Sequence, residues 1–409
     1  MKIGKQQIER RTNVKENYEK IKTVRSKDKF LVFGSPAIEE DEIQEVVASM
    51  KSGWLGTGPK VARFEADFAE YKGVRYSAAV NSCTAALHLS MLAAGLKKGD
   101  EVITTPMTFC ATVNAIIHSG AQPVLADIDP VTLNMDIKEV EKKITSRTKA
   151  IIPVHFAGRP CDMDPLIDLA RSRNIAIIED CAHAIETEYK GKKAGTIGDL
   201  GCFSFYATKN ITTGEGGMVI SSREDLISRI KVMALHGLSQ DAWKRFFDSG
   251  YKHYYVAEAG FKYNMMDLQA AIGIHQIKRV EEYWKRREKI WHRYTEALSD
   301  LNIGLPAPVE KDTRHAYHLF TIRIDPDKTG ISRDYFLEAM TKRNIGVGVH
   351  YLSIPEHPYY QKKFGWRSED FPNAHAFGRE TVSLPISPKL TERDVSDVIE
   401  AVRDIILKK

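Results

Sequence analysis

Short apolar segments alternate with amphipathic ones along most of this 409-residue chain, and that alternation limits the folds available to it. The apolar segments have the length of buried strands, which we place at 76–80, 101–105, 123–127, 150–154, 175–178 and 217–220. Helices are predicted at 39–51, 61–72, 84–94, 110–119 and 162–173. The first of them carries on one face Ile43, Val46, Val47 and Met50. Such alternation favours an α/β fold in which helices cover both faces of a mainly parallel sheet.

The last third of the chain has a different pattern. A long amphipathic helix is predicted over 267–300, and Pro306 and Pro308 mark a break after it. Beyond the break we expect a strand and two helices, at 319–324, 332–343 and 391–407. The expected organisation is an N-terminal extension, a large α/β domain and a smaller α+β domain, over 1–31, 32–280 and 281–409.

Composition narrows the class of protein. Hydrophobic residues make up 43% and charged residues 28%, which is ordinary for a globular protein and argues against global disorder. No apolar run reaches the roughly 18 residues of a membrane span, and the first residues lack the apolar stretch of a signal peptide. Five scattered cysteines without a CxxC pair indicate reduced thiols, so we expect a cytoplasmic protein without a metal site.

The net charge of +5 is concentrated at the start of the chain. Residues 1–30 hold ten Lys/Arg and four Asp/Glu, whereas the remainder holds 49 and 50. The body is therefore near neutral, and its charge gives no reason to expect nucleic-acid binding. The basic extension could bind an anionic surface, but a solvated helix is the interpretation that we favour.

Lys209 and Asp180 are the residues that indicate a chemistry most strongly. Asp180 ends an apolar strand, and Lys209 ends the segment FSFYATK 29 positions later. A lysine amine can form a Schiff base with the aldehyde of pyridoxal phosphate (PLP), and an aspartate can keep a proton on the pyridine nitrogen. The pairing predicts a PLP enzyme, in which burial would lower the pKa of Lys209 so that its amine can carry protons.

Seven motifs make this prediction more specific. They are GWLGTG at 53–58, NSCTA at 81–85, TPMTF at 105–109, EDCAHA at 179–184, FSFYATKN at 203–210, GEGG at 214–217 and KYN at 262–264. In this order and spacing the chain resembles, over about residues 32–405, the DegT/DnrJ/EryC1/StrS family of nucleotide-sugar aminotransferases. The resemblance implies a fold-type I PLP enzyme with a large, mainly parallel-sheet domain and a smaller α+β C-terminal domain.

The resemblance also implies which residues hold the cofactor phosphate. Thr84 and Ala85, at the start of a helix, would bind it with their backbone groups, helped by the hydroxyl of Ser204. Asn264 would reach the phosphate in the neighbouring subunit, which would make a homodimer with shared sites necessary for catalysis. The plainer alternatives are that Thr84 only caps its helix and that Asn264 only forms a turn.

Three further residues would surround the cofactor ring. By resemblance, Phe109 stacks on it, Asp180 pairs with its nitrogen and His183 lies near its ring oxygen. An aromatic residue near a strand end is otherwise a core residue, and a lone histidine after a strand is otherwise structural. The motifs favour the functional interpretation for all three.

Amino transfer would proceed in two halves. Glutamate would convert PLP to pyridoxamine phosphate and leave as 2-oxoglutarate, and the amino group would then pass to a keto sugar while Lys209 moves the proton. His183 and the stretch after Lys209 are similar to members that aminate C4, whereas C3 members tend to carry Gln in place of His183. The favoured substrate is a nucleoside-diphosphate 4-keto-6-deoxyhexose or a related 4-keto sugar. Its candidate contacts are Thr57, His318, His350 and Tyr351.

Other activities remain open. A C3-aminating enzyme would use the same residues. A PLP-dependent sugar dehydratase is disfavoured, because such relatives replace the lysine with histidine. A non-catalytic regulatory or binding protein would need neither Lys209 nor Asp180, and it would not need Phe109 or Ser204.

Overall fold

The computed structural model describes residues 25–26, 29–239 and 254–407. Most of the basic extension predicted at 1–31 lies outside these residues, so its role stays a prediction.

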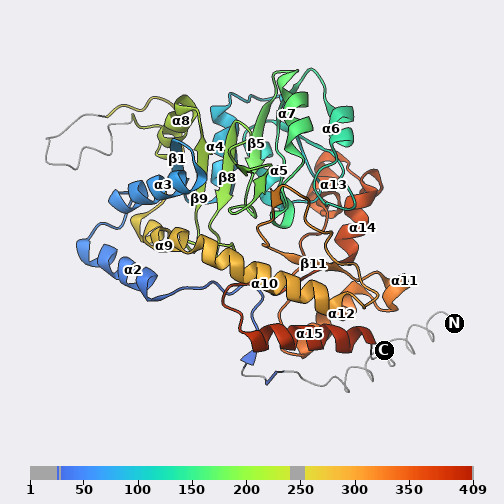
Figure 1. The fold of residues 1–409 in the computed structure, drawn as a ribbon. Helices are drawn as coiled ribbons and strands as arrows, with labels where there is room; N and C mark the ends of the chain where they lie inside the picture. Colours follow the sequence, from blue (N-terminus) through green and yellow to red (C-terminus); the bar gives the residue numbers. More distant parts are fainter. Residues whose placement is uncertain (1–24, 27–28, 240–253, 408–409) are drawn as a thin grey trace.

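A seven-stranded sheet forms the centre of the larger part of the molecule (Figure 1). Its order is β1-β9-β8-β5-β4-β2-β3, and β9 is antiparallel to both of its neighbours while the other pairs are parallel. The strands are β1 Tyr76–Val80, β2 Glu101–Thr104, β3 Gln122–Leu125, β4 Thr148–Ile151, β5 Ala176–Asp180, β8 Leu200–Ser204 and β9 Gly217–Ser221. The predicted mainly parallel sheet is confirmed.

Within this sheet, β8 is the one strand that sequence reasoning missed. Glycine and serine lower the β propensity of Leu200–Ser204, so its pattern does not indicate a strand. Tertiary packing explains the glycine, because a Cβ on Gly201 would lie 2.4 Å from the Cα of Gly195. Here the close approach of two backbone segments overrides local preference.

Helices cover both faces of the sheet, as expected. In chain order the longer ones are α2 Glu40–Ser52, α3 Pro59–Lys72, α4 Cys83–Ala93, α5 Cys110–His118, α6 Ile137–Lys143, α7 Met163–Arg171, α8 Glu224–Ala234, α9 Asp267–Lys278 and α10 Val280–Leu298. One core joins the sheet to α4, α5 and α8. On the other face, separate cores join it to α3 and α9 and to α6 and α7. Alternate residues of a strand therefore face different helical layers.

The prediction of one long helix over 267–300 is wrong in one respect, because this segment forms two helices. α9 ends at Lys278, and Arg279 leaves helical geometry with φ −99° and ψ 2° before α10 begins. The Arg279 side chain pairs with Asp41 and Glu42 of α2. This contact holds the chain at the point where the helix breaks.

The apolar side chains predicted on one face of α2 are only partly covered. Ile43 is 47% exposed and Met50 is 63% exposed, whereas Glu42 and Ser49 are buried. Glu42 accepts a hydrogen bond from Gln276 of α9 at 2.8 Å, so α2 turns a polar face inward. Its apolar face remains open on the single chain.

The C-terminal elements enclose a second core. An antiparallel pair, β11 Phe320–Arg323 and β12 Thr381–Leu384, packs with α10 and with α12 Arg333–Lys342 and α15 Glu392–Leu407. Shorter elements complete this part: α11 Pro326–Thr329, α13 Pro358–Phe364, α14 Pro372–Glu380 and the 3₁₀ turns Ile354–Glu356 and Ser368–Asp370. A three-stranded sheet of β10 Thr313–Arg314, β6 Glu188–Tyr189 and β7 Lys192–Lys193, and a 3₁₀ turn at Phe156–Gly158, lie beside the large sheet. The domain ranges themselves stay a prediction.

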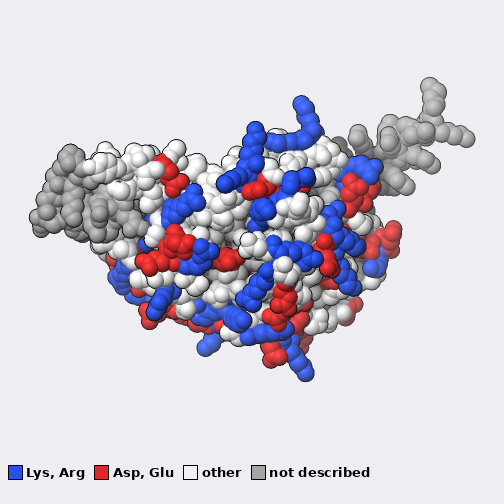
Figure 2. All heavy atoms as spheres, turned by 90° about the horizontal axis from the view of Figure 1, so that it is seen from above, with Lys and Arg blue, Asp and Glu red and all other residues white. Residues whose placement is uncertain are grey.

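Charge is mixed over the surface. Figure 2 shows basic and acidic side chains side by side on the face seen from above, without a field of one sign. None of the described helices combines the length and apolarity needed to cross a membrane.

Candidate active site

Asp180 is the last residue of β5 and lies against α5. Its carboxylate accepts hydrogen bonds from the Thr112 hydroxyl at 2.8 Å and from the Ala182 N–H at 3.1 Å. Burial raises the pKa of Asp180, although these hydrogen bonds and the charge of Lys209 oppose the rise. A carboxylate offers about four acceptor positions, so Asp180 can still bind a protonated ring nitrogen.

Lys209 lies in a loop that follows β8. The Lys209 N–H donates to the Tyr206 carbonyl at 2.9 Å, which closes a turn after the strand. Burial lowers the pKa of the Lys209 amine to about 8, and the neighbouring Cys83 and Asp180 oppose the fall. The amine is therefore uncharged far more often at neutral pH than an exposed lysine would be.

The N-terminus of α4 forms a cradle at the end of β1. Ser82 caps the helix by accepting the Ala85 N–H at 3.1 Å, so Thr84 is not the cap and the Ala85 N–H is already engaged. A Cβ on Gly217 would lie 2.5 Å from the Ser82 carbonyl carbon, so glycine is needed where β9 begins. Ser204 pairs with Gly217 across the sheet. The N–H groups that open α4 suit an anion such as phosphate.

A wall of rings borders the site. The Tyr351 hydroxyl lies 3.1 Å from Nε2 of His183, whose Nδ1 accepts the Ala157 N–H at 3.3 Å. Burial lowers the pKa of His183 well below its ordinary value, so the ring is neutral and its proton is on Nε2. Phe109 precedes α5, is 58% exposed, and has its ring centroid 5.8 Å from that of Tyr351. Phe109 is therefore an exposed side chain and not part of the core.

The two other histidines predicted for the sugar site extend this wall. The His318 ring lies against that of His183, with centroids 4.3 Å apart, and its Nδ1 is 2.8 Å from Asn210 Oδ1. The His350 and Tyr351 rings have centroids 5.0 Å apart. Burial lowers the pKa of His350 to about 4, so it is neutral at physiological pH. The structure therefore groups His318, His350 and Tyr351 around His183.

Thr57 and Asn264 bind each other. Nδ2 of Asn264 donates to the Thr57 hydroxyl at 2.6 Å, and that hydroxyl donates to the Met265 carbonyl at 2.5 Å. Asn264 bridges Val80 at the end of β1, so the pair borders the α4 cradle of its own chain. Among the described atoms, Oδ1 of Asn264 is buried without a hydrogen-bond partner. A ligand or second chain that donates to it would remove that cost.

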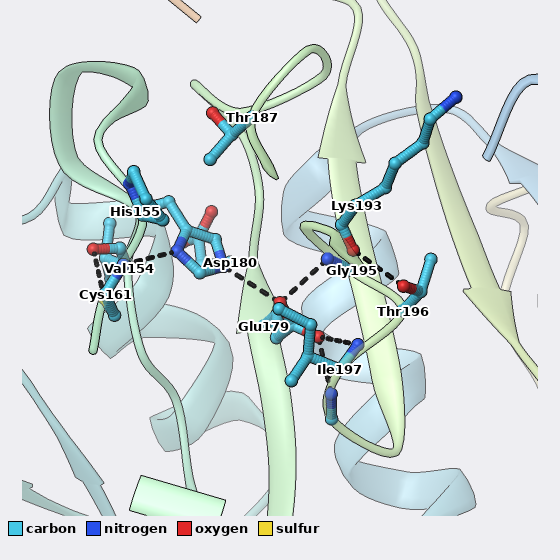
Figure 3. Close-up of polar contacts among 12 residues, drawn as sticks. Val154, His155, Cys161, Glu179, Asp180, Thr187, Lys193, Gly195, Thr196 and Ile197 are labelled. Carbon is cyan, nitrogen blue, oxygen red and sulfur yellow. Dashed lines mark hydrogen bonds and ion pairs between the residues drawn. The ribbon is translucent and has the colours of Figure 1, made fainter. Parts of the chain in front are cut away.

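Glu179, beside Asp180, belongs to a different network (Figure 3). Its carboxylate accepts the His155 Nε2–H at 3.0 Å and three backbone N–H groups at 2.6–2.8 Å, those of Gly195, Ile197 and Gly198. Nδ1 of His155 accepts the Cys161 N–H at 3.0 Å, which places the ring proton on Nε2. Cys181 lies near enough to complete a metal-like trio. Because these hydrogen bonds already occupy the histidine and the carboxylate, the trio is structural.

Comparison with known proteins shows the family of the chain. The model of the DegT/DnrJ/EryC1/StrS aminotransferase family matches residues 36–403. The chain belongs to this family. It is 49% identical over 385 residues to the spore coat polysaccharide biosynthesis protein SpsC of Bacillus subtilis, across 94% of this chain and 99% of that protein.

Solved structures of similar proteins share the fold. The PMP form of the putative sugar aminotransferase Spr1654 from Streptococcus pneumoniae has a TM-score of 0.85 and 33% identity, across 93% of this chain and 98% of that one. Helicobacter pylori PseC, an aminotransferase involved in the biosynthesis of pseudoaminic acid, has a TM-score of 0.86 and 28% identity, across 93% and 100%. The protein is a PLP-dependent sugar aminotransferase, as the resemblance implied.

The residues present fit this cofactor. Three features meet at the carboxyl ends of the strands, where α/β sheets bind ligands: a carboxylate with spare acceptor positions, a half-buried lysine of lowered pKa and the open N-terminus of α4. When bound, PLP supplies an electron sink for carbanion chemistry.

Sequence reasoning missed three residues of the site region. Thr112 supports Asp180, and its i, i+4 hydrogen bond with Thr108 at 2.8 Å follows from a spacing that the sequence displays. Glu186 and Asn210 contact each other across 24 positions, and no periodic pattern indicates such a pair.

Proposed function

We propose that this enzyme transfers the amino group of glutamate to C4 of a nucleoside-diphosphate 4-keto-6-deoxyhexose or a related 4-keto sugar. The neutral His183 beside Asp180 carries the proposal, because histidine at this position resembles C4-aminating members. The polar ring wall of Tyr351 and His318 supports a hydroxylated substrate. The description of PseC, an aminotransferase in pseudoaminic acid biosynthesis, agrees with an amino-sugar product, and that of SpsC agrees with a role in polysaccharide biosynthesis.

Each predicted cofactor residue has a proposed role. The start of α4 with Thr84 and Ala85 would hold the phosphate, together with Ser204, and the Ala85 N–H would then be shared between the Ser82 hydroxyl and the phosphate. Asp180 would accept a hydrogen bond from the protonated ring nitrogen. His183 would donate a hydrogen bond from Nε2 to the ring oxygen. Phe109 would cover the ring, since its side chain is open on the single chain. Thr57, His318, His350 and Tyr351 would contact the sugar nucleotide.

Lys209 would move the proton in both halves. Its Nζ takes a proton from Cα of glutamate and, in the second half, delivers one to C4 of the sugar. This role needs an amine that is often uncharged, and burial supplies it by lowering the pKa to about 8.

A homodimer with shared sites is part of the proposal. Several large apolar side chains are exposed on the single chain near the site and on α2, namely Ile43, Met50, Leu55, Tyr206 and Met266. A second copy would cover them, and Asn264 could then use its unpaired Oδ1 or its amide at the partner's cofactor. We also propose a cytoplasmic location, since all five cysteines are free.

The position of amination can be tested directly. Purified holoenzyme is supplied with ¹⁵N-glutamate and, in turn, with the UDP, dTDP and GDP forms of a 4-keto-6-deoxyhexose, and the product is read by NMR. We expect ¹⁵N on C4 with at least one of them. Label on C3 of an isomerised sugar, or label on none of the three, would contradict the C4 proposal.

A further inference from the structure

A chain of three buried polar side chains lies behind Lys209. Nδ2 of Asn210, the next residue, donates to Oε2 of Glu186 at 2.8 Å and to the Ala316 carbonyl at 2.9 Å. Oδ1 of Asn210 lies 2.8 Å from Nδ1 of His318. Glu186, Asn210 and His318 are 1%, 5% and 4% exposed. The amino-transfer steps proposed above use neither Glu186 nor Asn210.

The hydrogen bonds in this chain run in one direction. Nδ2 of Asn210 faces a carboxylate and a carbonyl, which only accept, so its amide cannot be turned around. Its Oδ1 therefore accepts, and Nδ1 of His318 must carry the proton. Burial lowers the pKa of His318 well below its ordinary value, so the ring is neutral. Nε2 of His318 is left with a lone pair and has no hydrogen-bond partner among the described residues.

Burying the Glu186 carboxyl group costs stability, so we ask what an acid at this position contributes. Burial raises the pKa of Glu186 to about 7 and lowers that of nearby Arg287 to about 10. Oε1 of Glu186 and Nε of Arg287 are both buried without hydrogen-bond partners among the described atoms. A glutamine would avoid a buried charge, but it could turn its NH₂ toward Asn210 and so reverse the direction of the hydrogen bonds. Above about pH 7 the Glu186 carboxylate is ionised and can only accept, so it fixes the direction there.

The two adjacent histidines consequently offer opposite groups. His183 carries its proton on Nε2, because its Nδ1 accepts the Ala157 N–H. His318 carries its proton on Nδ1 and offers a lone pair on Nε2. Their ring centroids are 4.3 Å apart, so a donor and an acceptor lie side by side. The Nε2–H of His183 is the proposed donor to the cofactor's ring oxygen, so the lone pair on Nε2 of His318 is the group left to accept a hydrogen bond from a sugar hydroxyl.

We infer that Glu186 and Asn210 are positioning residues that hold His318 in the Nδ1–H tautomer, so that its Nε2 accepts a hydrogen bond from a hydroxyl of the sugar substrate. The tautomer rests on the contacts above alone. The choice of a sugar hydroxyl as donor rests on the proposed function.

The tautomer can be read without any turnover. Holoenzyme labelled with ¹⁵N-histidine is studied at pH 8 by long-range ¹H–¹⁵N NMR, which separates a protonated ring nitrogen from one with a lone pair. The His318 signals are those that a His318→Asn variant lacks. We expect a proton on Nδ1 in the wild type. A proton on Nε2, or a doubly protonated ring, would overturn the inference whatever the enzyme aminates.

Variants then test the positioning role. Asn210→Leu should give a mixture of His318 tautomers, and Glu186→Gln should give a smaller admixture. As the matched control, Asn302→Leu removes an exposed amide that donates to the Lys328 carbonyl at 2.6 Å, and it should leave His318 unchanged. A pure Nδ1–H signal in both Asn210→Leu and Glu186→Gln would show that neither residue sets the tautomer.

Kinetics separates this inference from the proposed function. With the keto sugar that the wild type aminates, Asn210→Leu should raise KM by about two- to tenfold and Glu186→Gln should raise it by less, with smaller changes in kcat, because only the Nδ1–H fraction of His318 can accept the substrate's hydrogen bond. An unchanged KM together with a mixed tautomer would contradict the sugar contact. If no keto sugar is aminated at all, the proposed function fails while the tautomer result stands.

Discussion

Glu179 and Asp180 are neighbours in β5, yet the protein surrounds their carboxylates in opposite ways. Burial by itself raises the pKa of Glu179, but the hydrogen bonds from His155, Gly198 and Gly195 hold it below its ordinary value. Asp180 has fewer such donors, and burial raises its pKa. Hydrogen-bond donors of the protein occupy the oxygens of the Glu179 carboxylate, whereas the Asp180 carboxylate keeps acceptor positions that a ligand can use.

The alternation of the strand explains how neighbours come to differ. Ile177 packs in the core with α6 and α7, and Ile178 packs in the core with α4 and α5. By the same alternation Glu179 meets the 195–198 loop, and Asp180 meets Thr112 of α5. Glu179 thus has a structural role and Asp180 a functional one. Both are buried, so the number of protein hydrogen bonds to their oxygens distinguishes the two roles better than burial does.

The largest expected effect comes from a similar comparison between two lysines. Lys72 is buried and Lys209 is half-buried, and desolvation lowers the pKa of each amine to about 8. Lys72 donates to the Ile185 carbonyl at 3.0 Å and lies over the Phe203 ring. We expect Lys209→Ala to slow the conversion of glutamate to 2-oxoglutarate by roughly 10³-fold or more, since proton transfer by a positioned group contributes about 10²–10⁴.

Lys72→Met is the matched control for that loss. It removes a buried amine that contacts only structural groups, so it should lower the unfolding midpoint while a folded sample keeps the glutamate half-reaction. Equal losses of activity in the two variants would show that a lowered pKa alone does not mark the catalytic lysine.

The pH dependence of cofactor capture sharpens the same comparison. Only the uncharged Lys209 amine attacks an aldehyde, and its pKa is about 8. The rate at which apoenzyme captures PLP should therefore rise about tenfold per pH unit below pH 8 and level off above it. A rate that keeps rising to about pH 10, where an ordinary lysine titrates, would contradict a buried amine.

A smaller effect is expected for another buried acid, Glu186. Its folded pKa is about 7, raised by burial from an ordinary 4.5. Between these values the native state holds a proton that the unfolded chain has lost, so stability falls as pH rises through this window. Glu186→Gln removes that dependence. Relative to wild type, its unfolding free energy should improve by on the order of 2 kcal/mol from pH 5 to pH 8 in urea titrations; a difference that is constant with pH would contradict a buried ionisable Glu186.

Much of the fold follows from local pattern, because buried parallel strands and amphipathic helices have distinct periodicities. The pattern locates most strands and the position of Asp180 at the end of one of them, and the FSFYATK motif supplies Lys209. It does not find β8, where Gly201 packs on Gly195, or the break at Arg279, where a side chain binds another helix. Those features depend on contacts between distant segments.

The site shows the same division. The strand ends and the helix that follows β1 are visible in the sequence, so the cradle can be predicted, although the helix cap is Ser82 and not Thr84. The grouping of His183, His318 and Tyr351 brings together three separate segments, and spacing alone gives no sign of it. Glu186 is hidden for the same reason, since a buried acid looks like a surface one in a sequence.

The most direct test compares Asp180→Asn with Glu179→Gln. For each apoenzyme, PLP affinity is measured by fluorescence titration and the unfolding free energy is measured in urea. Asp180→Asn should weaken PLP binding by about ten- to a hundredfold with little change in stability, because it loses a charged hydrogen bond to the ring. Glu179→Gln should cost on the order of 3 kcal/mol of stability, because its NH₂ would face backbone donors, and folded protein should bind PLP nearly as tightly as wild type. If Glu179→Gln weakens PLP binding as much as Asp180→Asn does, or if Asp180→Asn leaves it unchanged, the division of roles between these neighbours is wrong.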